Sequence, residues 1–212
     1  MTEKPEIDVE ELRAELDQIK DAMGLQERYE GAATQWLLFG VLVAIAAGLS
    51  QYVFLADLPG YWYGVIWIGL LFGGGAVGIY WIFGSDARDL FSTNSDKPGL
   101  FFIFWVVYLA SIPLQVIASQ YTGEVAEDAE TMFVLAIILV MIGVAYVIMG
   151  NVLKAYYIRA RDRYAFYGGG LLMAALGTAI PFVEVLQTWG YAVLGVVYLA
   201  YALATYVALN RY

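Results

Sequence analysis

The ionisable residues of this chain leave few options for chemistry. Among its 212 residues there is no cysteine and no histidine. Disulfides, thiolate or imidazole metal sites and the usual cysteine or histidine catalysis are therefore excluded. The acidic residues Asp86, Asp89 and Asp96 share one polar connection, but their spacing matches no established cation-binding loop. We expect no catalytic residue, no metal site, no cofactor and no nucleic-acid partner.

The strongest concentration of positive charge lies between residues 154 and 163. Its basic residues are Lys154, Arg159, Arg161 and Arg163. Basic residues beside apolar spans fix membrane topology and contact anionic headgroups, and we expect that role here. A nucleotide or phospholipid headgroup site is an alternative, although no phosphate-cradling glycine loop accompanies the stretch.

A set of polar residues falls at similar depth within the apolar stretches, where it could line an outward-facing cavity. These residues are Gln51, Ser111, Gln115, Ser119, Thr178 and Glu184. Such a cavity would suit a small uncharged or cationic solute. The alternative is that these groups form hydrogen bonds between helices. No apolar stretch has an acid or base near its middle, which argues against a proton-coupled pump or a voltage sensor.

Long apolar stretches must position these groups. The chain is 61% hydrophobic and 15% charged, whereas soluble domains are about 45–50% apolar and about 25% charged. Six stretches have the roughly 20 residues that a membrane-spanning helix needs. We place them at 34–55, 60–83, 99–120, 131–153, 164–183 and 188–209. The sequence therefore predicts an all-α, polytopic integral membrane protein, with a six-helix bundle of three helical hairpins over residues 34–212.

The basic residues indicate how this bundle is oriented. All eleven lysines and arginines fall on one side of the six-span arrangement, and the opposite loops hold only acids. Because basic residues favour cytoplasmic loops, we expect a multi-pass protein of the plasma membrane with both termini in the cytoplasm. Acids outnumber bases 20 to 11. This excess favours a halophilic archaeal source, in which net charge keeps a protein soluble at high salt.

Residues 1–33 form an acidic head that precedes the first span. Five apolar residues repeat in it at spacings of three and four: Val9, Leu12, Leu16, Ile19 and Met23. This is the seam of a short coiled coil, and it predicts a helix that docks on a partner protein or on a second copy. The alternative is an amphipathic helix that folds against the protein's own cytoplasmic loops. A position on the membrane surface is disfavoured because anionic lipids repel an acidic segment.

The second span is rich in glycine. The residues concerned are Gly60, Gly64, Gly69, Gly73, Gly74 and Gly78. Pairs of glycines four positions apart allow helix backbones to approach closely. We expect tight packing inside one bundle, and an interface between subunits is the alternative.

These patterns favour a non-catalytic membrane protein, a subunit or regulator that docks a partner through its head. The expected partners are the lipid bilayer and a protein partner or a second copy. A passive transporter or channel for a small solute is the alternative function. A membrane enzyme ranks third, because the spans lack acid and base groups.

Overall fold

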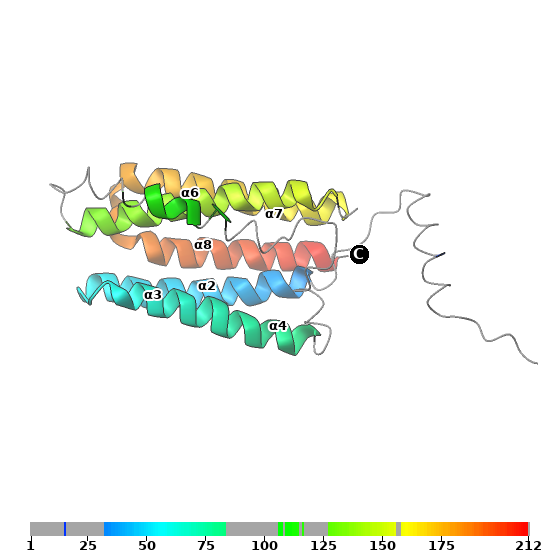
Figure 1. Ribbon diagram of the computed structural model, residues 1–212, viewed down its shortest axis with the longest axis horizontal. Helices are drawn as coiled ribbons and strands as arrows, with labels where there is room; N and C mark the ends of the chain where they lie inside the picture. The colour runs from blue at the N-terminus through cyan, green and yellow to red at the C-terminus, as the bar shows by residue number, and fades with distance from the viewer. Residues whose placement is uncertain are drawn as a thin grey trace, which may run out of the picture.

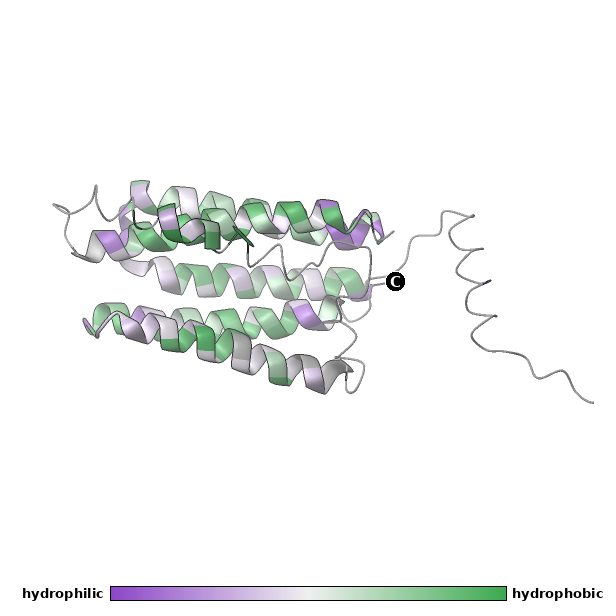
Figure 2. Cartoon of the chain, in the orientation of Figure 1, coloured by the Kyte–Doolittle hydropathy of each residue, from purple (hydrophilic) through white to green (hydrophobic). Residues whose placement is uncertain are grey.

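The computed structural model describes residues 32–83, 127–155 and 158–211, together with Glu15 and parts of the stretch from 106 to 116. The described residues are 91% helical and contain no strand, so the all-α fold class is confirmed there. Five helices are long and apolar enough to cross a membrane. Their hydrophilic residues lie mostly toward the helix ends, with apolar residues between them (Figure 2). The predicted span at 99–120 lies largely outside the described residues and stays a prediction.

The helices follow the predicted spans with modest shifts at their ends. They are α2 (Ala32–Leu55), α3 (Tyr61–Ile68), the π-helix η1 (Gly69–Gly74), α4 (Gly75–Phe83), α6 (Glu127–Val152), α7 (Ala160–Ala179), the 3-10 turn η3 (Ile180–Phe182) and α8 (Glu184–Asn210). The elements α3, η1 and α4 follow one another without a break and form the second span.

The turn between α2 and α3 is built around Asp57. This residue has a φ of 48°, in the left-handed region that aspartate tolerates better than most residues. The Leu58 amide donates to the Val53 carbonyl at 3.0 Å, and the Asp57 amide donates to the Phe54 carbonyl at 3.4 Å. This is the hydrogen-bond pattern of a Schellman motif, which satisfies carbonyls left free at a helix end. The chain then runs back along α2.

The long helices form two tightly packed pairs. One pair is α2 with α8 and the other is α6 with α7, and α3, η1 and α4 lie against α2 (Figure 1). A hydrogen bond of 3.1 Å from Arg161 to the Arg211 carbonyl joins the start of α7 to the end of α8. We call this end of the molecule, with residues 154–163 and Arg211, the basic end. The α2–α3 turn and the start of α8 lie at the opposite end.

The boundary between α7 and α8 differs from the predicted polar break at residues 184–187. Only Val183 separates η3 from α8, and Glu184 is already helical. Pro181 cannot donate a backbone hydrogen bond, which ends α7. An acid in the first turn of a helix is favourable beside the free amides there. The Gln187 side chain donates to the Pro181 carbonyl at 2.8 Å. The polar residues thus begin a helix.

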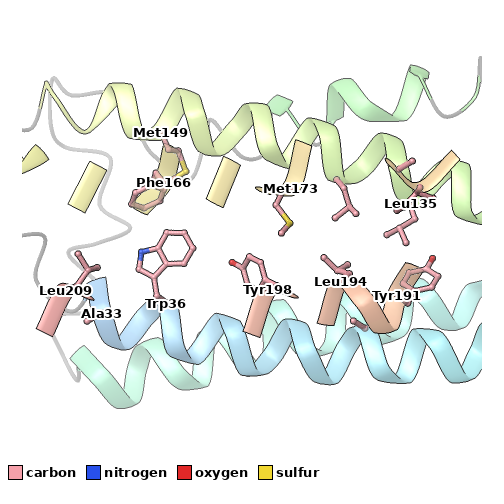
Figure 3. Close-up of a cluster of buried hydrophobic side chains, with 14 of the residues drawn as sticks. Ala33, Trp36, Leu135, Met149, Phe166, Met173, Tyr191, Leu194, Tyr198 and Leu209 are labelled. Atoms are coloured by element: carbon pink, nitrogen blue, oxygen red, sulfur yellow. The ribbon is translucent and has the colours of Figure 1, made fainter. Parts of the chain in front are cut away.

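Aromatic side chains fill the core between the helix pairs near the basic end. Trp36 of α2 is only 6% exposed, and its ring lies 5.2 Å from that of Phe166, 5.6 Å from Tyr146 and 5.7 Å from Tyr201. Figure 3 shows Trp36 and Phe166 pointing toward each other from α2 and α7. The hydroxyls of Tyr146 and Tyr198 are 2.6 Å apart, which joins α6 to α8. This cluster ties all four long helices together.

Glycines allow direct backbone contact between α6 and α7. A Cβ atom added at Gly143 would lie 2.6 Å from the Gly170 carbonyl oxygen, and one added at Gly170 would lie 2.7 Å from the Gly143 oxygen. A Cβ at Gly177 would lie 2.7 Å from the Ala136 oxygen. In membranes, where the hydrophobic effect does not drive helices together, such close contact holds them through van der Waals packing.

Candidate functional site

Gln51, which the sequence places in a solute cavity, joins α2 to α8. Its Nε2 donates to the Thr188 carbonyl at 2.9 Å, and its Oε1 accepts from the Ala192 amide at 3.0 Å. In an unbroken helix the Ala192 amide would donate to the Thr188 carbonyl directly. The backbone of Trp189 leaves the helical region here, at φ −114° and ψ 17°. The carboxamide of Gln51 therefore fills a break in the hydrogen-bond ladder of α8.

The other predicted cavity residues have separate surroundings. Thr178 is exposed and donates to the Ala174 carbonyl within its own helix at 2.8 Å. Glu184 is exposed at the start of α8, and Ser111 is only 1% exposed. Within the described residues, no hydrogen bond joins Gln51, Thr178 and Glu184 to one another. The predicted residues Gln115 and Ser119 lie outside the described part of the chain. The solute cavity stays a prediction.

A small pocket lies at the same end of the bundle. It has a volume of about 60 Å³ and lies between the α2–α3 turn and the start of α6, with Asp57, Tyr63 and Thr131 in its lining. A water molecule needs roughly 10–15 Å³ of such space, and pockets for organic ligands measure about 300–1,000 Å³. The pocket therefore has room for a few water molecules or a small ion.

The six glycines of the second span divide into two groups. Gly74 and Gly78 face α2, where a Cβ at Gly74 would lie 2.8 Å from Leu42 and one at Gly78 would overlap Leu38. These two glycines pack inside the bundle, as the sequence predicts. At the remaining four, no atom of the described residues lies within 4 Å of the position where a Cβ would stand. We call these four the open glycines: Gly60, Gly64, Gly69 and Gly73.

The span that carries the open glycines is the least covered of the five. Only 6% of its apolar window, Tyr61–Gly78, is buried, whereas the other four spans are 33–39% buried. Large apolar side chains on it, including Val65, Ile68 and Val77, are more than half exposed. In the part of the chain that the structure describes, α2 makes most of the contacts with this helix, and Tyr63 also stacks on Tyr191 of α8, with ring centres 5.4 Å apart.

The basic end brings the predicted basic residues together with Arg211. Arg159 forms a two-pronged ion pair with Asp162, at 3.0 Å from Nε to Oδ2 and 3.2 Å from Nη2 to Oδ1. Asp162 is only 1% exposed and lies in the first turn of α7. Lys154 and Arg161 are exposed. This end therefore carries every described lysine and arginine.

No protein-family model, curated protein or solved structure matches this chain. The arrangement of its own residues therefore carries the functional argument. The docking seam Val9, Leu12, Leu16, Ile19 and Met23 lies outside the described residues, and it stays a prediction.

The break at Trp189 was not predicted from the sequence. The nearest proline is Pro181, eight positions earlier, and the neighbouring Gly190 is compatible with an unbroken membrane helix as well as with a kink. The contact of Gly143 with Gly170 follows a pattern that the sequence does show, since Gly170, Ala174 and Gly177 lie at helical spacing in the fifth span. As in the second span, such small residues predict tight packing inside the bundle.

Proposed function

We propose that this chain is a non-catalytic integral membrane protein that serves as a subunit or regulator of a membrane complex. The uncovered helix formed by α3, η1 and α4 carries the proposal. Its open glycines form two pairs at a spacing of four, Gly60 with Gly64 and Gly69 with Gly73, and no described atom occupies the space beside them. Helices associate in lipid where small residues let backbones approach. A second transmembrane helix, from another subunit, fits this surface.

The interior of the bundle favours a subunit or regulator over a transporter or channel for a solute. The carboxamide of Gln51 is committed to α8, and the hydroxyls of Tyr146 and Tyr198 bind each other. These polar groups join helices, which is the alternative that the sequence left open. The pocket beside Asp57, Tyr63 and Thr131 is itself too small for an organic solute.

The course of the chain supports six membrane spans. The second span ends at Phe83, at the basic end, because it runs back along α2. The helix α6 begins at the opposite end, where Thr131 lines the same pocket as Asp57. The connection from residue 84 to residue 126 must therefore lead from one end of the bundle to the other. We assign this passage to the predicted span at 99–120.

The distribution of charge supports the orientation that we propose, with both termini in the cytoplasm and the bundle in the plasma membrane. All described bases lie at the basic end, and the exposed acids Asp57 and Glu184 lie at the opposite end. Since basic residues favour the cytoplasmic side, the basic end is assigned to the cytoplasm. The acidic head then lies on the same side, and its seam docks the partner.

The test compares full-length protein with variants that fill the space beside the open glycines. The protein is purified from its native membrane in mild detergent at high salt, which screens the self-repulsion of a chain of net charge −9. Molar mass is measured by light scattering, and associated proteins are identified by mass spectrometry. The variant carries Gly69→Ile and Gly73→Ile. The control carries Gly48→Ile, because Gly48 of α2 also has no atom within 4 Å of its Cβ position.

We expect the double variant to lose its partner, or its second copy, while its helical circular dichroism stays unchanged. The control should keep the association. A form that lacks residues 1–24, and a variant with Leu12, Leu16 and Ile19 changed to serine, test the head separately. Full-length protein that is monomeric and free of any stoichiometric partner would refute the proposed function, and solute flux in proteoliposomes would then be measured for wild type and Gln115→Leu.

A further inference from the structure

The basic end carries positive charge that the described residues leave uncompensated. Its basic residues are Lys154, Arg159, Arg161, Arg163 and Arg211, and Asp162 is the only acid described there. Arg159 is paired with that acid. Arg161 is bound to a backbone carbonyl, which is neutral and leaves its charge in place. In the described part of the chain, no acid pairs with Lys154, Arg163 or Arg211.

Arg163 indicates that an acceptor belongs at this end. Its Nε is shielded from solvent and has no hydrogen-bond partner among the described residues. A buried donor that has lost water without gaining an acceptor is costly, and more so when it belongs to a charged group. An acceptor for this donor would have to come from outside the described residues.

The acidic head joins the bundle at this end. The helix α2 begins at Ala32, and Ala33 lies in the same buried cluster as Leu209 near the end of α8. Residues 1–30 contain ten acids and four bases, which gives this segment a formal charge of −6. The chain thus carries its most acidic segment directly beside its most basic surface.

We propose that the acidic segment 1–30 docks on the basic end of its own bundle through charge complementarity. Exposed ion pairs are individually weak, so the contact depends on several pairs acting together. The short connection to α2 strengthens the contact, because it holds the segment at a high effective concentration near the basic end. The contact needs no protein partner and therefore goes beyond the proposed function.

An anionic lipid headgroup is the competing occupant. The head is favoured because it is tethered to every copy of the bundle, whereas a headgroup must be recruited from the bilayer. The charge of the head also favours the head, rather than a lipid headgroup, as the occupant of the basic end. If lipids filled the basic end, a segment of charge −6 would be held against an anionic leaflet that repels it.

The test measures the distance from the head to the basic end in the full chain. Since the chain has no cysteine, Gln18→Cys and Ala155→Cys provide two unique sites for spin labels. The labelled protein is placed in phosphatidylcholine nanodiscs, and the distance distribution is recorded by double electron–electron resonance. We expect a short-distance population at low salt that disappears near 1 M salt, where the Debye length is only about 3 Å.

Charge reversals establish which groups make the contact. Lys154→Glu with Arg161→Glu should abolish the short distance, and so should Glu11→Lys with Glu15→Lys. All four changes together should restore it. Glu184→Lys, at the opposite end, is the control and should leave it unchanged. Leu12→Ser with Leu16→Ser should also leave it unchanged, which separates this contact from partner docking through the apolar seam.

Three results would overturn the proposal. The first is a distance distribution that is the same at low and high salt. The second is a short distance that survives the reversal at Lys154 and Arg161. The third is no short distance in phosphatidylcholine, together with binding of phosphatidylglycerol that depends on those two residues; this result would assign the basic end to lipid headgroups.

Discussion

Gln51 and Thr188 are joined by a hydrogen bond of 2.9 Å although 137 positions separate them in the chain. The same carboxamide accepts from the Ala192 amide, so one side chain satisfies both backbone groups that the break at Trp189 sets free. Both groups are partly buried, and a backbone group that loses water without gaining a hydrogen-bond partner is costly. The break in α8 and the side chain of Gln51 therefore depend on each other.

Gln51→Leu should destabilise the bundle by about 1–3 kcal/mol, because it leaves a partly buried carbonyl and a partly buried amide without partners. Gln187→Leu is the matched control, since Gln187 is exposed and binds only the Pro181 carbonyl. The free energy of unfolding in detergent, from a denaturant titration, provides the comparison. Equal stability of Gln51→Leu and wild type would mean that the Ala192 amide donates directly to the Thr188 carbonyl when the carboxamide is absent.

Two glycine-to-alanine changes should act in opposite directions. Gly143→Ala should destabilise the protein by about 1–3 kcal/mol, because the new methyl group meets the Gly170 carbonyl and overpacks the contact. Gly48→Ala should stabilise it by about 0.5–1 kcal/mol, because alanine favours the helix and nothing stands in its way. Thermal unfolding followed by circular dichroism measures both. Unchanged or raised stability of Gly143→Ala would contradict the close approach of α6 and α7, and a loss of stability in Gly48→Ala would contradict the open space beside Gly48.

The hydroxyls of Tyr146 and Tyr198 should behave as one unit in a double-mutant cycle. Each single change to phenylalanine is expected to cost about 1 kcal/mol, because it removes the hydrogen bond between the two hydroxyls. The double variant should lose little more than either single variant, with a coupling energy of about 0.6–1.7 kcal/mol. Tyr164→Phe, at an exposed position, is the control. Additive losses would show that the two hydroxyls do not bind each other.

Asp162→Ala should destabilise the start of α7 by about 1–3 kcal/mol, because it removes the partner of Arg159 and an acid beside the free amides of the helix. Glu184→Ala is the control. It removes an exposed acid from the first turn of α8 and should cost no more than about 0.3–1 kcal/mol. Amide hydrogen exchange over residues 160–164 locates the effect. Protection that is unchanged there would refute the role given to Asp162.

The sequence predicts the helices of this protein better than the contacts between them. Apolar stretches of sufficient length indicate spans whatever their neighbours are, so five of the predicted spans match described helices within a few residues. The boundary at Glu184 was displaced because a polar run after Pro181 is consistent with either a loop or the first turn of a helix. The sixth span and the seam of the head fall outside the described residues and remain predictions.

The roles of single polar residues were less predictable. A glutamine inside a span can face a cavity or another helix, and the two cases have the same local sequence. What decides the role of Gln51 is the break at Trp189, which lies on a helix far away in the chain. The glycines show the same limit: the spacing of four recurs through the second span, yet Gly78 packs on Leu38 while Gly69 has open space.

The separation of charge between the two ends makes the bundle a fixed electric dipole along its helices. Among residues whose side chains the structure describes, five bases and one acid give the basic end a formal charge of +4, and Asp57, Glu130 and Glu184 give the opposite end −3. A membrane potential acts on each transferred charge with about 2.3 kcal/mol per 100 mV. With the basic end inside, an interior-negative potential favours this orientation of the described bundle, whereas the acidic head of charge −6 on the same side opposes it.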